Sequence, residues 1–198
     1  MLLAFSGFKG SGKDTAARVL IDEYGFTKIA FADALREALL VLNPIITLND
    51  GQVITSLSTV VTGVGWDFAK NNYPEVRRLM QVFGTEVGRS FFGDNVWIDI
   101  LAKRYPAISD DDTRYVITDC RFENECEFVQ QVNGTILWID RPGLSSDGHA
   151  SESAVPLHYA EALLYNDETI EELEEDVRFF LFMRGITADN RATKVEHS

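Results

Sequence analysis

The fold of this chain is decided by its first fifteen residues, Met1-Leu-Leu-Ala-Phe-Ser6 followed by Gly7-Phe-Lys-Gly-Ser-Gly-Lys-Asp-Thr15. The apolar stretch predicts a buried strand, and the glycines after it let the backbone turn tightly and approach a ligand closely. Several main-chain N–H groups then converge on one anion at the start of a helix predicted from Lys13 to Tyr24. The spacing matches G-x-x-x-x-G-K and predicts a loop that binds nucleotide phosphates.

Lys13 and the two residues after it carry the chemistry of this loop. A lysine at the positive end of a helix dipole is unfavourable unless an anion neutralises both, so a turn that only packs a helix on a sheet does not explain Lys13. Asp14 stands where serine or threonine is usual. It is either a carboxylate that stabilises the first helical turn or a magnesium ligand, direct or through water. Thr15 is the rival ligand.

Length and composition limit the class of protein. With 198 residues, of which 45% are hydrophobic, the chain can form one domain with a sizeable core. No segment approaches the roughly 20 apolar residues of a membrane span, and a phosphate loop at residue 7 leaves no room for a cleaved signal. Cys120 and Cys126 make neither a disulfide framework nor, with three histidines, a metal set. We expect a reduced, cytoplasmic protein.

The charge of the chain bears on its partners. The net charge is −13 and the sequence pI is about 4.6. An acidic surface repels polynucleotide backbones, so binding of DNA or RNA across a broad face is not expected. A small anionic substrate is still possible, because a local basic pocket can hold one inside an acidic exterior.

Apolar strands and helices alternate along most of the chain. Strands are predicted at 1–6, 26–31, 114–118, 135–139 and 162–165, and helices at 13–24, 33–42, 122–132 and 168–184. Such alternation predicts an α/β fold of the P-loop class, a parallel sheet with right-handed crossovers and flanking helices. We predict one domain with a core at 1–32, 114–140 and 157–198.

Two segments interrupt this core. The stretch 43–113, within an insertion that starts near residue 33, contains a turn at Asn49-Asp-Gly51 and helical patterns at 74–91 and 95–104. We expect an all-helical insertion that forms a movable flap over a binding cleft. The irregular, glycine- and serine-containing segment 141–156 predicts a short lid.

Polar clusters follow the predicted strands. Asp33 and Arg36 come after the second strand, whose end faces the ligand crevice of an open α/β sheet; they either bind substrate or serve as a helix cap and a solvated charge. Asp119 closes an apolar strand, as in the Walker-B arrangement that holds magnesium, or it caps the next helix. Arg121 lies just beyond Asp119. Asn166 is either a cap or a contact to a nucleotide base.

A helical face and the lid supply further candidates. Arg78, Gln81, Thr85 and Arg89 step by three or four residues, so they could share one face that suits a phosphate and a base edge, or simply an exposed face. Arg141 enters the lid and could reach a transferring phosphoryl group only when the lid shuts. Phosphoryl transfer needs such charge neutralisation and the exclusion of water.

Five segments together resemble the bacteriophage deoxynucleoside monophosphate kinases, within the nucleoside monophosphate kinase group of P-loop proteins. They are Gly-Lys-Asp-Thr at 12–15, Phe-Ala-Asp-x-Leu-Arg at 31–36, Leu-Met-Gln-x-Phe-Gly-Thr-Glu at 79–86, Asp-x-Arg-Phe-x-Asn-Glu at 119–125 and His-x-Ser-Glu at 149–152. The stretch 43–73 matches no part of the pattern. The ordered set is far more specific than the phosphate loop alone.

The resemblance implies ATP as donor, Mg²⁺, and a deoxynucleoside monophosphate as acceptor. ATP would be bound by Gly10, Ser11, Gly12, Lys13, Asp14 and Thr15. The metal would be held by Asp14, Thr15 and Asp119. The catalytic residues would be Lys13, Asp14, Arg121 and Arg141. The acceptor would be bound by Asp33, Arg36, Arg78, Gln81, Arg89, Asp119, Arg121 and Glu152.

Other functions remain open at this point. A second enzyme class is another small-molecule P-loop kinase, of the dephospho-coenzyme A or phosphomevalonate kinase type. A nucleotide-binding switch or ATPase would need only the donor site, so the two arginine-bearing clusters and the lid favour a kinase. A homodimer is one option for the assembly, and the preferred bases are not legible in the sequence.

Overall fold

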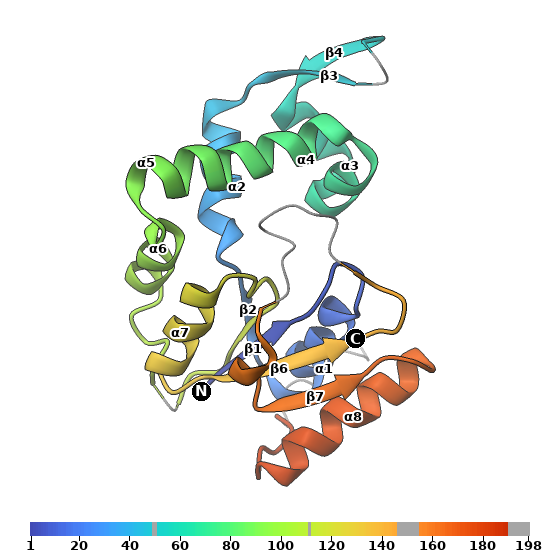
Figure 1. Cartoon of the computed structure of the whole chain (residues 1–198). Helices are drawn as coiled ribbons and strands as arrows, with labels where there is room; N and C mark the ends of the chain where they lie inside the picture. The colour runs from blue at the N-terminus through green and yellow to red at the C-terminus, as the bar shows by residue number, and fades with distance from the viewer. Residues whose placement is uncertain (49–50, 111, 146–154, 190–198) are drawn as a thin grey trace, which may run out of the picture. The chain divides into compact units, whose positions relative to one another are not determined.

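The computed structural model describes residues 1–48, 51–110, 112–145 and 155–189. The chain folds into two compact units (Figure 1). The first unit comprises Met1–Ala30 and Ala102–Ser198, and the second comprises Phe31–Leu101. Helix α6, Val96–Arg104, runs across the boundary between these two ranges.

A five-stranded parallel sheet forms the centre of the first unit, as the alternating pattern predicts. Its strands are β1 Leu2–Ser6, β2 Thr27–Ile29, β5 Tyr115–Ile117, β6 Thr135–Asp140 and β7 Ala162–Tyr165. Their order is β2-β5-β1-β6-β7, and each neighbouring pair is parallel. Strand β1 is central and all five of its residues are buried, so the glycine-rich loop follows the middle strand. This arrangement confirms the predicted parallel sheet of the α/β fold.

Helices pack on this sheet. They are α1 Lys13–Tyr24, α7 Glu123–Gln131 and α8 Ile170–Met183. A short 3₁₀ helix, η3 Leu157–Tyr159, precedes β7. Helices α1 and α8 share a cluster of buried apolar side chains with β1 and β6. Helix α8 begins at a capping box, in which Thr169 accepts from the N–H of Glu172 at 3.2 Å and donates its own N–H to the Glu172 carboxylate at 2.9 Å. The buried face of α8 carries Leu173, Val177 and Leu181. Its acidic residues Glu171, Glu172, Glu175 and Asp176 are exposed.

The second unit is not all-helical, which corrects the expectation for this stretch. It contains α2 Ala32–Leu42, an antiparallel hairpin of β3 Ile45–Leu48 and β4 Val53–Ser56, and α3 Leu57–Asn72. Alternation explains the hairpin, because Ile46 and Leu48 are buried while Ile45 is exposed. Asn49 and Asp50 of the predicted turn lie outside the described residues.

The predicted helix at 74–91 is present, but its middle is wound differently. It consists of α4 Pro74–Gln81, the π-helical segment η1 Val82–Arg89 and α5 Ser90–Phe92. The indole Nε1 of Trp97 donates to the carbonyl of Gly84 at 2.8 Å, and a side chain bonded to a helical carbonyl competes with the regular ladder. The three-to-four-residue spacing used to align side chains on one α-helical face therefore does not hold beyond Gln81.

No helix in the described parts of the chain is both long and apolar enough to cross a membrane.

Candidate active site

The phosphate-binding loop is built on the end of β1. Ser6 is buried, and its Oγ donates to the carbonyl of Cys120 at 3.0 Å, which ties β1 to the segment after β5. Gly7 has φ +134°, and a Cβ there would collide with the main-chain oxygen of Ile139 and lie 2.9 Å from Ser11 Oγ. Only glycine permits both this backbone and this close approach. The loop is therefore packed directly against β6.

Lys13 closes the loop from the start of α1. Its Nζ donates to the carbonyls of Gly7 and Phe8 at 2.7 and 2.6 Å and to Ser11 Oγ at 3.3 Å. The side chain is buried, with 7% of the residue exposed. An ammonium group has three protons to donate, so the lysine holds the loop in shape while keeping its positive charge at the helix start. This is the position expected for a cation that meets the phosphates.

Two residues from distant parts of the chain form hydrogen bonds to the same loop. Arg141, just after β6, donates from Nη1 to the carbonyl of Gly10 at 3.2 Å. Asn166, just after β7, donates from Nδ2 to the carbonyl of Ser11 at 2.8 Å. From the sequence, Asn166 was predicted to be either a helix cap or a contact to a nucleotide base. Its hydrogen bond to the loop was not predicted. The available signal was a polar residue at the carboxyl end of a parallel strand.

Asp14 is paired with a residue that the sequence did not single out. Lys28 on β2 donates from Nζ to Asp14 Oδ1 at 2.6 Å. Both side chains are solvent-accessible, 40% for Lys28 and 73% for Asp14, so the pair contributes little to stability. The Asp14 carboxylate thus lies at the mouth of the loop with a positive partner, while Thr15 beside it is partly buried.

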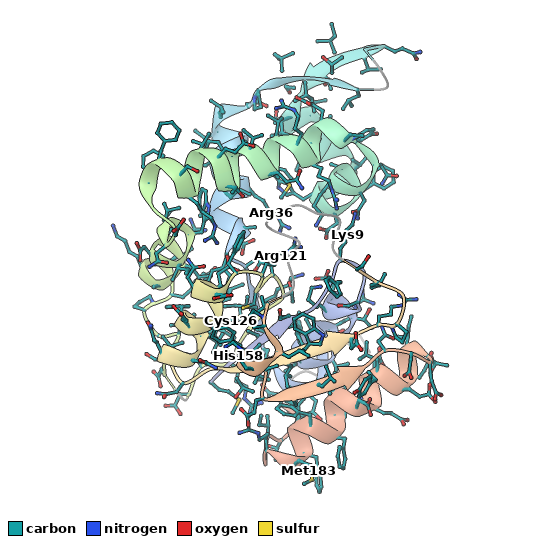
Figure 2. The ribbon with its side chains drawn as sticks, in the orientation of Figure 1. Lys9, Arg36, Arg121, Cys126, His158 and Met183 are labelled. Atoms are coloured by element: carbon teal, nitrogen blue, oxygen red, sulfur yellow. The ribbon has the colours of Figure 1, made fainter. Side chains whose placement is uncertain are left out.

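The segment after β5 is organised by Glu125. This carboxylate is 3% exposed and accepts from the main-chain N–H groups of Arg121 and Phe122 at 2.7 and 3.1 Å. Glu125 therefore caps the start of α7. Asp119 lies just before this cap and is partly buried. Figure 2 labels Arg121 on this segment and Lys9 at the tip of the phosphate loop.

The two cysteines lie together beneath this segment. Their sulfur atoms are 3.3 Å apart and both residues are buried. The hydrogen bond between the two sulfur atoms and burial both raise the pKa of the Cys120 thiol. The Cys120 thiol is therefore held in its neutral form. No group of three or more His, Cys, Asp or Glu residues within the described ranges is arranged to hold a metal ion by itself.

In the second unit, Arg36 joins α2 to α3. Its guanidinium lies 3.6 Å from Asp33 and 3.9 Å from Asp67, and Lys70 lies 3.8 Å from Asp67. The buried Nε of Arg36 makes no hydrogen bond within the part of the chain that the structure describes, although 26% of the side chain, which Figure 2 labels, is exposed. A buried N–H without an acceptor is costly, and an anionic ligand would relieve that cost.

The other second-unit candidates each have their own surroundings. Arg78 is exposed and donates to both carboxylate oxygens of Glu75 at 2.7 Å, which lowers the pKa of the Glu75 carboxyl. Arg89 is 7% exposed and donates to the carbonyl of Asp94 at 2.7 Å. Gln81 is partly buried at the junction of α4 and η1. The remaining candidate, Glu152, lies outside the described residues.

Comparisons with known proteins identify the family. A family model described as deoxynucleotide monophosphate kinase matches residues 57–177. A protein of Acanthamoeba polyphaga mimivirus, provisionally named a deoxynucleotide monophosphate kinase, is 31% identical over 194 residues, which cover 89% of this chain and 94% of that protein. The deoxynucleotide monophosphate kinase of Escherichia phage RB69 is 32% identical over 113 residues, 56% of this chain and 46% of that enzyme.

Solved structures give more distant likenesses. The shikimate kinase of Aquifex aeolicus is 14% identical with a TM-score of 0.49, over 93% of this chain and 98% of that one. A dephospho-CoA kinase of Campylobacter jejuni is 12% identical with a TM-score of 0.49 over the same shares. The extensive match to the family model and to the mimivirus protein confirms the resemblance read from the motifs, and the chain belongs to the deoxynucleotide monophosphate kinase family.

Proposed function

We propose that this kinase, a phosphotransferase of deoxynucleotides, transfers the γ-phosphoryl group of ATP to the 5′-phosphate of a deoxynucleoside monophosphate at the loop of residues 7–15. The loop follows the central strand and opens a helix, where main-chain N–H groups and the dipole favour phosphate. The N–H groups of Gly10 and Gly12 make no hydrogen bond within the described ranges. Both are therefore available as donors to the β- and γ-phosphates, beside Lys13.

Magnesium fits the donors near this loop. Asp14, Thr15 and Asp119 offer carboxylate and hydroxyl oxygens, the hard ligands that Mg²⁺ takes while keeping several waters and binding substrate phosphates. Held there with ATP, the ion would supply positive charge that offsets the charge of the phosphates. Asp14 fits the role of a metal ligand because its carboxylate already binds a cation, the ammonium group of Lys28. A metal ion could replace that ammonium group.

Two arginines could neutralise the negative charge of the transferred phosphoryl group. Arg141 already contacts the loop through Gly10, and Arg121 follows the strand beside β1. We assign both to the transferred phosphoryl group, whose oxygens carry spread negative charge in the transition state. As a member of the segment 141–156, Arg141 would complete its contacts when that lid shuts and water is excluded.

The second unit supplies the acceptor candidates. Arg36, with its unsatisfied Nε, is the strongest of them, together with Asp33, Arg78, Gln81, Arg89 and, near the lid, Glu152. Asp119 is proposed to contact both the metal and the acceptor, and Arg121 both the transferred phosphoryl group and the acceptor. We propose one kinase domain in which 33–113 is the acceptor-binding insertion and 141–156 is the lid.

The position of Lys13 in the loop is the observation that supports this function most strongly, and replacing Lys13 tests the proposal. Lys13→Ala should abolish transfer, measured as coupled ADP release with dGMP, dTMP, dAMP and dCMP at saturating ATP and Mg²⁺. A control variant, Lys103→Ala, changes an exposed lysine of α6 and should keep wild-type turnover. Near-normal turnover of Lys13→Ala would show that the phosphate loop is wrongly assigned.

A further inference from the structure

Side-chain donors hold the carbonyl groups of the phosphate loop. Lys13 donates to the carbonyl groups of Gly7 and Phe8. Arg141 donates to the carbonyl group of Gly10, and Asn166 donates to the carbonyl group of Ser11. Lys13 and Arg141 are charged and have roles in the proposed transfer. Asn166 is neutral and has none, so its bond to the loop needs its own explanation.

The Asn166 bond fixes the direction of one N–H group. The peptide between Ser11 and Gly12 is trans, like every other described peptide bond, and in a planar trans peptide the C=O and N–H point in opposite directions. With its carbonyl oxygen 2.8 Å from Asn166 Nδ2, this peptide turns the Gly12 N–H away from Asn166. That N–H makes no hydrogen bond among the described residues, so it is presented for a ligand.

Asn166 is itself held in place. Its main-chain N–H donates to the carbonyl of Asp140 at 2.7 Å, directly beyond the pairing of Asp140 with Tyr165 at the ends of β6 and β7. Gly12 approaches it so closely that a Cβ would lie 2.6 Å from Asn166 Nδ2 and 2.9 Å from Leu173 of α8. The amide therefore joins the loop to a rigid corner of the sheet.

We propose that Asn166 is a positioning residue for phosphate binding, which orients the Gly12 N–H toward the phosphates of ATP without touching them. The inference rests on the proposed function of the loop and names a residue of the same site. It requires an N–H donor at this position. A side chain that cannot donate leaves the Ser11 carbonyl unheld, and a carboxylate would also repel both that carbonyl and the phosphates.

Two variants and a matched control test this. Asn166→Ala removes the donor, and Asn166→Asp keeps the size but replaces the donor with a negative charge. Gln130→Glu makes the same amide-to-acid change in the same unit, at an exposed Nε2 that donates to the carbonyl of Tyr159 at 3.4 Å. The dissociation constant of ATP with Mg²⁺ is measured calorimetrically in the absence of acceptor. The KM of ATP and of the best deoxynucleotide, and the melting temperature, are measured beside it.

We expect Asn166→Ala to weaken ATP binding about tenfold, the scale of one lost hydrogen bond of about 1.4 kcal/mol. Asn166→Asp should weaken it further, on the order of 100-fold, because repulsion is added. The KM of the deoxynucleotide should stay within about twofold of wild type, and Gln130→Glu should match wild type throughout.

Two results would overturn the role of Asn166. One is unchanged ATP affinity in both variants. The other is an equal loss for ATP and deoxynucleotide accompanied by a lower melting temperature, which would mark a general structural residue. A wild-type protein that binds ATP but releases ADP with no acceptor would instead reject the proposed transfer and leave the loop measurement valid.

Discussion

At the scale of single residues, the phosphate loop depends on partners that come from far along the chain. Lys13 satisfies carbonyls within the loop itself, whereas Lys28, Arg141 and Asn166 reach it from β2 and from the ends of β6 and β7. Because these strands are parallel, their carboxyl ends meet at one edge of the sheet. The residues that follow them therefore converge on the same loop.

Asp14 should be needed for magnesium rather than for folding. Asp14→Asn keeps the size of the side chain but removes the negative charge, so half-maximal activity should require a several-fold higher Mg²⁺ concentration. The exposed pair with Lys28 is worth at most about 1 kcal/mol, so the free energy of unfolding should change little. The measurement is a Mg²⁺ titration of ADP release, with Asp22→Asn, an exposed carboxylate on the same helix, as control. An unchanged Mg²⁺ requirement would transfer the ligand role to Thr15.

Arg141 should matter more for the rate than for ATP binding. Arg141→Ala removes the guanidinium that we propose acts mainly when the lid is shut, and arginines with such a role are worth on the order of 10³-fold in kcat. Steady-state kinetics with saturating ATP would measure the effect, beside Arg18→Ala on the exposed face of α1. A normal kcat with only a raised KM would place Arg141 in ground-state binding.

At the scale of elements, the π-helical segment η1 is in close contact with one tryptophan, Trp97. Trp97 bonds the Gly84 carbonyl, and its ring fills the space beside Gly88, where a Cβ would lie 2.8 Å from Cε2 and 2.9 Å from Nε1 and closer still to Cζ2. The ring cannot move without breaking its hydrogen bond. The glycine is therefore required by packing rather than by backbone conformation.

Gly88→Ala should destabilise the protein by about 1–3 kcal/mol through overpacking. Gly63→Ala is the matched control, because a Cβ at Gly63 in α3 meets nothing within 4 Å; there the helix propensity of alanine should leave stability unchanged or raise it by up to about 1 kcal/mol. Urea unfolding followed by tryptophan fluorescence compares the two. Equal stability of both variants would mean that Trp97 does not constrain η1.

At the scale of the whole molecule, the acidic chain presents its positive charge locally. A net charge of −13 disfavours long polyanions, while we propose that Lys13 and Arg141 at the loop and Arg36 in the second unit bind small phosphates. The pattern suits a kinase of mononucleotides.

The acceptor should be a 2′-deoxynucleotide, and more than one base should be accepted. The proposed arginines suit a phosphate, and only Gln81 is an obvious reader of a base edge, with an amide that can rotate to match donors or acceptors. Preference for the deoxy sugar needs bulk against C2′ rather than a hydrogen-bonding group. The measurement is kcat/KM for dGMP, dTMP, dAMP and dCMP beside GMP, UMP, AMP and CMP. Equal use of ribonucleotides would reject the deoxy preference, and activity on one base would reject the breadth.

Much of the fold was predictable because its signals are local. The apolar runs of β1 and β6, the loop glycines and the periodicity of α1 and α8 each act within a few residues, and all five strands of the sheet were predicted. The hairpin β3–β4 was missed because only its turn was recognised in a stretch interpreted as helical. The π-helical winding of η1 was missed because the apolar pattern of 74–91 fits an ordinary α-helix, and Trp97, which bonds the Gly84 carbonyl, lies beyond that helix in the sequence.

The sequence by itself determined the phosphate loop, the parallel sheet and the family, since a strand, a glycine turn and a lysine at a helix start are specified by adjacent residues. Only the tertiary structure decided which side chains hold that loop. Asn166 is 155 residues from Ser11 and Arg141 is 131 residues from Gly10. No spacing rule links residues so far apart, and their meeting follows from the order in which the parallel strands pack beside β1.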